Sequence, residues 1–128
     1  MVILNSVARI VIGFSVLFIG FAVWSLILIA LLPWRVARIK ACNVFGSTVG
    51  RAVYFCSGCS LNVKGRELVD FSKPAIYISN HTSVLDIFIG IWQSPMGTVG
   101  IAKESIIYYP LFGQIYHLSG HLRIDRSN

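Results

Sequence analysis

One apolar run near the amino terminus constrains the fold more than any other feature. Residues 10–34 are 25 residues without an ionisable side chain, rich in Ile, Leu, Val and Phe. About 20 apolar residues suffice to cross the roughly 30 Å of hydrocarbon in a bilayer. A cleaved signal peptide has a shorter apolar core and then a small-residue cleavage site, whereas this run ends in Pro33, Trp34 and Arg35. The run therefore predicts a retained membrane anchor, with Trp34 at the interface.

Positive charge is concentrated around this run. The chain has a formal net charge of +6, 55% hydrophobic residues and only 12% charged residues, about half the charged share of a soluble domain. These values exclude a disordered chain and a simple soluble domain. Residues 1–60 carry no acidic side chain and five basic ones, namely Arg9, Arg35, Arg38, Lys40 and Arg51. Basic residues that bracket an apolar run indicate an anionic membrane surface and argue against nucleic acid as a partner. Their bias places the rest of the chain on the cytoplasmic face, which is that of the inner membrane if the protein is bacterial.

A second apolar stretch, residues 41–63, contains Arg51 near its middle. A charge at the bilayer centre costs about 2.5–3.5 kcal/mol on insertion scales, so a full second crossing is disfavoured. We expect a re-entrant or interfacial helix, with Gly46 and Gly50 forming a small-residue face against the first helix. The pattern leaves open one crossing or a helical hairpin on the membrane.

Cys56 and Cys59 have the spacing of a redox or zinc motif. A redox pair would open a helix after a strand, and a zinc site would need two further ligands at matching spacing, neither of which this region supplies. We therefore expect these thiols to act as small apolar side chains.

The second half of the chain has an α/β pattern. Residues 75–79 and 98–102 predict strands and residues 122–124 a weaker third. Between the first two strands, residues 84–92 predict a helix with Thr82 or Ser83 as its N-cap. This order favours a parallel strand–helix–strand unit and hence an α/β fold with a mostly parallel sheet.

His81 and Asp86 stand at the junction of the first predicted strand and the helix. Asp86 lies in an apolar run, where a carboxylate is costly without a partner, and His81 is the nearest candidate. A carboxylate behind an imidazole fixes its tautomer and stabilises its protonated form, which prepares a histidine to act as a general base. The alternative is a hydrogen bond that only caps the helix.

Three blocks carry a resemblance to a known family. Residues 80–86 (NHTSVLD), 103–113 (KESIIYYPLFG) and 120–126 (GHLRIDR) resemble, in order, the NHxSxxD, KxxLxxxPxFG and GxxxIDR blocks of the glycerolipid acyltransferases, specifically the 1-acyl-glycerol-3-phosphate acyltransferases. With the apolar amino terminus, the resemblance covers nearly the whole chain. It implies a membrane helix or hairpin at 1–63 and the first part of an acyltransferase catalytic domain at 64–128.

The resemblance also implies roles for individual residues. His81 would deprotonate the free hydroxyl of lysophosphatidic acid, Asp86 would orient His81, and the hydroxyl would attack an acyl thioester to give phosphatidic acid. Asn80, Lys103 and Arg126 would bind the acceptor, the two basic residues through its phosphate. The donor would be acyl-CoA or acyl-carrier protein, with no separate cofactor. No metal is expected, because Gly120 should end a helix between His117 and His121 and no carboxylate joins them.

The sequence departs from the family at two places. Arg123 stands where the third block often has Phe, and the family's later FPEGTRS block, whose Glu and Arg help bind the acceptor, is absent from these residues. A core of residues 64–128 alone would be marginal and would end at an open sheet edge. We therefore expect the N-terminal portion of a longer acyltransferase. The alternatives are an acyltransferase for another lysolipid head group, an inactive truncated membrane scaffold and, less favoured, a membrane thiol protein.

Overall fold

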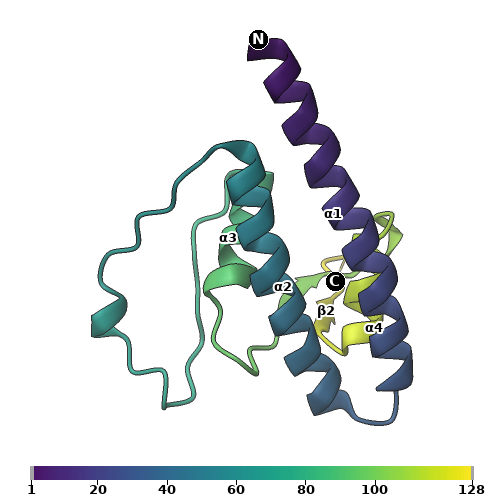
Figure 1. The fold of residues 1–128 in the computed structure, drawn as a ribbon. Helices are drawn as coiled ribbons and strands as arrows, with labels where there is room; N and C mark the ends of the chain where they lie inside the picture. The colour runs from purple at the N-terminus through teal and green to yellow at the C-terminus, as the bar shows by residue number, and fades with distance from the viewer. Residues whose placement is uncertain (1, 128) are drawn as a thin grey trace.

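The computed structural model describes residues 2–127. Over this range the chain forms four α-helices, two short 3-10 helices and a two-stranded parallel sheet. Figure 1 shows α2 in the middle of the molecule, with α3 on one side and with α1 and α4 on the other. The combination of a long apolar amino-terminal helix with a parallel sheet confirms the predicted fold class.

Helices α1 (Val2–Ala30) and α2 (Arg35–Ser57) form an antiparallel hairpin (Figure 1). Pro33 lies in the turn between them, where its missing N–H and fixed φ stop the first helix. Within the described residues Leu4–Ala30 is the one helix segment long and apolar enough to cross a membrane, with a mean hydropathy of 2.5. At about 1.5 Å per residue, its 27 residues would extend for roughly 40 Å.

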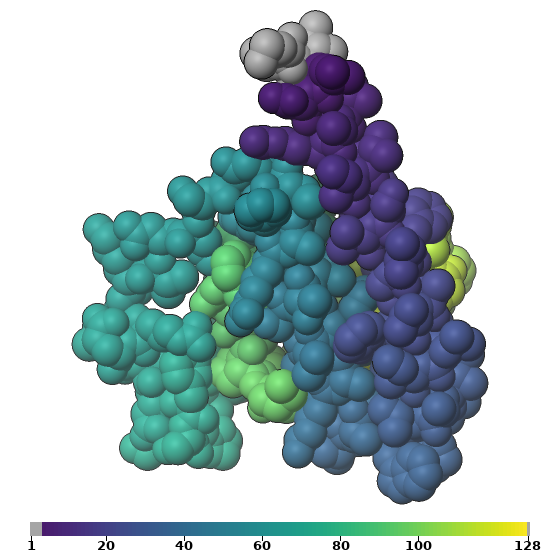
Figure 2. Space-filling view, in the orientation of Figure 1, coloured from purple at the N-terminus to yellow at the C-terminus, as the bar shows by residue number. Residues whose placement is uncertain are grey.

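The core is built where α1, α2 and α4 (Phe112–Ser119) meet. Its most buried side chains are Phe21, Leu28, Cys42, Phe45, Val49 and Ile115. The Phe21 ring packs edge-on against the Phe45 ring, with 5.3 Å between their centroids. The centroid of the Trp24 ring lies 5.2 Å from that of Phe45. The Trp24 indole also donates to the Ala41 carbonyl at 2.8 Å. One face of the second half of α1 therefore packs against α2 and α4, while Figure 2 shows the amino-terminal part of α1 projecting beyond the rest of the molecule.

The expected contact of Gly46 and Gly50 with the first helix is wrong. Both glycines face α3 (Val84–Gln93). A Cβ at Gly46 would come 3.0 Å from Ile91, and one at Gly50 would come 2.6 Å from the Phe88 carbonyl oxygen. The close approach to α1 occurs instead at Gly20, where a Cβ would meet the Phe45 ring at 3.0 Å. Sequence spacing identified the small face of α2 but could not identify which helix covers it.

The strand predicted at residues 75–79 is also wrong. Apart from a 3-10 turn, η1 (Arg66–Leu68), the chain from residue 58 to residue 83 has no regular structure, and it forms the wide loop on the left of Figures 1 and 2. Ile76 and Ile78 are 89% and 91% exposed. A strand needs a hydrogen-bonded neighbour, and among residues 2–127 no strand lies beside this segment.

The observed parallel unit lies further along the chain. Strand β1 (Ile101–Lys103) is followed by η2 (Glu104–Tyr108), then α4, then β2 (Leu122–Ile124). In the parallel register Ile101 pairs with Leu122 and Lys103 with Ile124. The strand predicted at 98–102 is thus shifted towards Lys103, and the one predicted at 122–124 is confirmed. The crossover helix of the parallel pair is α4, and the predicted helix at 84–92 is present as α3.

Candidate active site

His81 and Asp86 meet at the amino-terminal end of α3. The helix begins after Ser83, which is the N-cap in extended conformation, and Asp86 lies in the first turn. His81 Nδ1 is 3.5 Å from Asp86 Oδ2. This distance exceeds that of a normal N–H···O hydrogen bond, although catalytic hydrogen bonds often tighten only when substrate binds. His81 therefore lies beside Asp86 at the start of the helix, as expected for its nearest candidate partner.

Main-chain donors hold the Asp86 carboxylate more closely than His81 does. The N–H groups of Thr82 and Ser83 donate to Asp86 Oδ2 at 2.8 Å and 2.7 Å, while Ser83 Oγ accepts from the Leu85 N–H at 3.2 Å. This reciprocal arrangement is a capping box. The two main-chain hydrogen bonds, and to a smaller extent His81, hold the pKa of the Asp86 carboxyl below its usual range. Asp86 therefore caps the helix and faces His81 at once, and the two readings of this pair are compatible.

The imidazole is accessible to a substrate. The His81 side chain is 53% exposed and the Asp86 side chain 30%. Asn80 immediately precedes His81 and is also exposed, without a hydrogen-bond partner among the residues that the structure describes. An open imidazole with an anchored carboxylate behind it can accept a proton from a hydroxyl group.

Lys103 and Arg126 lie at the carboxyl end of the parallel pair. Lys103 ends β1 opposite Ile124, and Arg126 follows β2 by two residues. Neither forms an ion pair within residues 2–127. The Asp125 carboxylate accepts hydrogen bonds from Ser127 instead. The Ser127 N–H and hydroxyl donate to Asp125 Oδ1 at 2.9 Å and 2.6 Å, and both hydrogen bonds lower the pKa of Asp125. Two free cations thus stand at one edge of the sheet, and no described hydrogen bond or ion pair connects them to His81 or Asp86.

The final glycine of the second block has a packing role. A Cβ on Gly113 would overlap the carbonyl oxygens of Ile106 and Ile107, so the start of α4 can approach η2 only with glycine at this position. The preceding Leu111 has φ +65°, and the Phe112 N–H reaches the Pro110 carbonyl at 2.7 Å, which makes a strained γ-turn. Sequence analysis did not predict this role, although the Pro–Leu–Phe–Gly run was a turn signal.

The third block contains a group of hydrogen bonds that the spacing of its residue types did not predict. His121 Nδ1 accepts from the Gly100 N–H at 3.2 Å, and Gly120, with φ 81°, separates His121 from the helix that carries His117. Burial, and then the Arg35 guanidinium, lower the pKa of His121.

In the part of the chain that the structure covers, no three His, Cys, Asp or Glu side chains are grouped as metal ligands.

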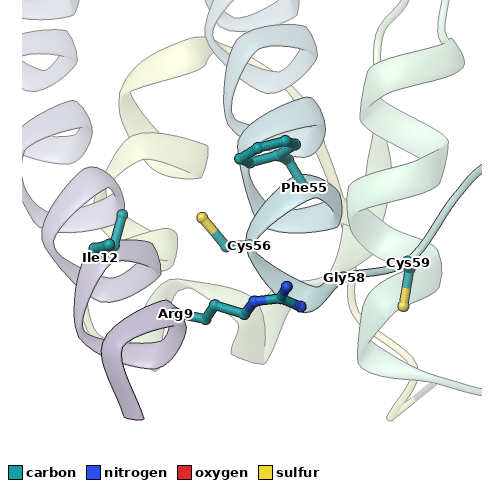
Figure 3. A pocket seen from close by; sticks show the side chains of 6 residues that line it. All are labelled: Arg9, Ile12, Phe55, Cys56, Gly58 and Cys59. Atoms are coloured by element: carbon teal, nitrogen blue, oxygen red, sulfur yellow. The ribbon is translucent and has the colours of Figure 1, made fainter. Parts of the chain in front are cut away.

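The two cysteines of the CxxC sequence lie beside an open cavity of about 340 Å³ between the ends of α1 and α2. Figure 3 shows the Cys56 sulfur directed towards α1 and the Cys59 sulfur on the other side of the end of α2, with Arg9 reaching between them. All three cysteines of the chain are free thiols. The cavity is lined by none of the five candidate site residues.

Comparison with known proteins identifies the class. A family model described as Acyltransferase matches residues 60–128, which contain His81, Asp86 and all three blocks. The chain therefore belongs to the acyltransferase family.

Eight curated proteins similar to this chain share one name, 1-acyl-sn-glycerol-3-phosphate acyltransferase. The protein of that name from Limnanthes alba is 44% identical over 98% of this chain and 44% of its own length. The Cocos nucifera protein is 48% identical over 96% of this chain and 39% of its length, and the Escherichia coli protein is 48% identical over 70% and 36%. The chain thus spans less than half the length of these relatives. No solved structure matches it significantly.

Proposed function

We propose that this chain is part of an enzyme that transfers an acyl group from acyl-CoA or acyl-carrier protein to the free hydroxyl of lysophosphatidic acid, giving phosphatidic acid. The observation that carries the proposal is the exposed His81 imidazole facing the anchored Asp86 carboxylate, within the residues that match the acyltransferase family. The names of the similar proteins support the choice of acceptor and product.

The chemistry requires one proton carrier. Because His81 Nδ1 faces Asp86, Nε2 remains to take the proton of the acceptor hydroxyl. The hydroxyl oxygen forms a bond to the thioester carbonyl carbon, the carbon–sulfur bond breaks, and the thiol leaves with the proton that His81 returns. The acyl group passes directly from sulfur to oxygen, so the reaction uses neither an acyl-enzyme nor a separate cofactor.

The acceptor's phosphate would bind to Lys103 and Arg126, with Asn80 beside the reacting hydroxyl. Arginine offers paired donors to phosphate and lysine a point charge, and both side chains are free of ion pairs between residues 2 and 127. The substrate itself would have to bridge the sheet edge and the start of α3. Residues 64–128 would therefore supply the first part of the catalytic domain, and substrate is the partner that brings its two groups of residues into one site.

The enzyme would be membrane-bound, with residues 1–63 as its anchor and its active site on the cytoplasmic face. The length and hydropathy of Leu4–Ala30 support membrane association. The bias of basic residues towards the end of this helix supports the orientation, and a lipid acceptor is itself delivered by the bilayer.

The test is acyl transfer in membranes that contain the full-length protein. Labelled acyl-CoA and acyl-carrier protein are supplied in turn with lysophosphatidic acid or with a lysolipid that bears another head group. We expect transfer to lysophosphatidic acid, a loss of about 10²–10⁴-fold in rate for His81→Ala, and a loss on the order of 10⁴-fold for Asp86→Asn, since the amide favours the wrong tautomer.

The matched control is His117→Ala, because His117 is exposed on α4 and has no side-chain partner among the described residues. It should keep the wild-type rate. A His81→Ala enzyme that is as fast as this control would overturn the mechanism. Preference for a different head group would overturn only the assignment of the acceptor.

A further inference from the structure

Two arginines at the start of α2 hold the corner between α4 and β2. Arg35 Nε donates to the Gly120 carbonyl at 3.1 Å, and Arg38 Nη1 donates to the Leu118 carbonyl. The last carbonyls of a helix have no partner within it and form the negative end of its dipole. The two guanidinium groups therefore satisfy the carboxyl end of α4 in both hydrogen bonding and charge.

Arg38 is committed to the protein interior. It is half-buried, and its Nε is fully buried without an acceptor among residues 2–127. A guanidinium in this position is not available to a lipid head group, although the sequence grouped Arg38 with the basic residues of the membrane surface. Lys40 lies two residues further along, is exposed, and has no side-chain partner in the described part of the chain.

The corner is tied to both strands. The Leu122 N–H donates to the Gly100 carbonyl at 3.0 Å, and His121 Nδ1 accepts from the Gly100 N–H. The Tyr116 hydroxyl lies 2.9 Å from the Gly100 carbonyl oxygen and 2.7 Å from that of Leu122. At the corner itself, a Cβ on Gly120 would come 3.1 Å from Arg35 Cγ. A displacement of the corner would therefore displace β2 and the start of β1 together.

From this corner β2 leads directly to the free cations of the sheet edge. Its last residue, Ile124, pairs with Lys103, and Arg126 follows two residues later. We infer that Arg38, assisted by Arg35, is a positioning residue for acceptor binding, because it fixes the corner that sets where Lys103 and Arg126 present their charge. This inference rests on the proposed function, in which these two side chains bind the acceptor's phosphate.

The kinetic test compares Arg38→Ala with Lys40→Ala in the full-length protein. We expect Arg38→Ala to raise the KM for lysophosphatidic acid about tenfold. Displaced Lys103 and Arg126 side chains would lose part of a charge-assisted hydrogen bond to the acceptor's phosphate, and a loss of that kind has about this effect. The KM for the acyl donor and kcat should stay within about twofold, since only the acceptor contacts the sheet edge. Arg38→Lys should restore most of the affinity, because its ammonium can still donate to the Leu118 carbonyl, and Lys40→Ala should match wild type.

Two kinetic results would overturn the inference. One is an acceptor KM for Arg38→Ala equal to that of Lys40→Ala. The other is a fall in kcat with unchanged KM values, which indicates only a smaller folded fraction. If Arg38→Ala does not fold, Arg35→Ala replaces it, because Arg35 is exposed and its loss removes a single contact to the same corner. A smaller rise in acceptor KM then supports the inference, and no rise overturns it.

A second measurement needs no substrate. Amide hydrogen exchange of residues 122–124 should be faster in Arg38→Ala than in Lys40→Ala, because the corner that seats β2 has been released. If wild-type protein does not acylate lysophosphatidic acid, the proposed function is wrong. Amide hydrogen exchange alone then tests whether Arg38 fixes the position of β2. Equal exchange in the two variants would overturn that role of Arg38 even in an active enzyme.

Discussion

The imidazole of His121 lies at the base of the α4–β2 corner, where burial controls its charge. Burial disfavours the imidazolium, and the Arg35 guanidinium disfavours it further, so the pKa lies below the ordinary value of 6.5. The neighbouring Tyr116, whose ring centroid is 5.2 Å away, has its pKa raised to about 12 by burial. At neutral pH both side chains are uncharged, His121 as an acceptor and Tyr116 as a donor.

Stability should therefore depend on pH through His121. As the pH falls through about 6.5, the unfolded chain binds a proton at this histidine before the folded protein does, so the free energy of unfolding decreases. His121→Asn keeps an acceptor near the Gly100 N–H but does not titrate, and we expect it to reduce this decrease. Denaturant unfolding at about pH 7.5 and about pH 5.5 measures the effect. His117→Asn, on an exposed histidine, should leave the wild-type dependence intact, and an equal change in both variants would contradict the assignment.

At this scale the sequence predicted side-chain chemistry better than main-chain chemistry. It indicated that Asp86 needs a partner and placed His81 near it, as observed at 3.5 Å. The closer partners are the N–H groups of Thr82 and Ser83. Every residue except proline has such a group, so no pattern of residue types distinguishes the two that Asp86 uses.

Between helices, α2 and α3 approach each other closely at one glycine. Gly50 sets this approach, because a Cβ there would come 2.6 Å from the Phe88 carbonyl oxygen and 2.8 Å from Trp92 Cβ. Gly90, on α3 itself, has no atom of another described element within 4 Å of an added Cβ. An added methyl group would therefore overlap α3 at Gly50 but would meet no neighbouring element at Gly90.

This difference predicts opposite effects of one substitution. Gly50→Ala should lower the free energy of unfolding by about 1–3 kcal/mol, since the two backbones must separate. Gly90→Ala should raise it by up to about 1 kcal/mol, because alanine favours helix and meets no neighbour. Unfolding followed by circular dichroism in detergent tests both. A Gly50→Ala protein as stable as Gly90→Ala would show that α2 and α3 are not this close.

Elements were predictable where their signals are local. The helix at α3 follows from a capping residue and an apolar run, and β2 from a short run after Gly120. The segment 75–79 has an equally apolar sequence, but a strand is stabilised by a neighbour that the segment itself does not encode. The partner of the Gly46 and Gly50 face was missed for the same reason, because α1 and α3 are both apolar.

In the molecule as a whole, the apolar hairpin and the family-matching half share one core. Sequence composition changes near residue 64 and indicates two parts, but composition does not record which apolar faces meet. Ile115 of α4 lies in the same cluster as Phe21 and Leu28 of α1. One side of α1 thus belongs to the shared core, while Phe14, on the same helix, is 59% exposed.

Two phenylalanines of α1 should therefore differ sharply in their effect on stability. Phe21→Ala should lower the free energy of unfolding by about 3–5 kcal/mol through the cavity it leaves. Phe14→Ala should change it by no more than about 0.5 kcal/mol, as is usual for an exposed position. Thermal unfolding of both variants in one detergent provides the comparison. Equal losses would mean that α1 does not contribute to the core.

The shared core has a consequence for the order of events during synthesis. Chains emerge from the ribosome amino terminus first, so Phe21 and Leu28 are exposed well before Ile115 exists. During that interval the bilayer is the one extensive apolar phase open to α1 if the protein is made at a membrane, as we propose. Lipid would then act as a temporary substitute for α4, and completing the enzyme would mean exchanging lipid contacts for protein contacts along one side of the first helix.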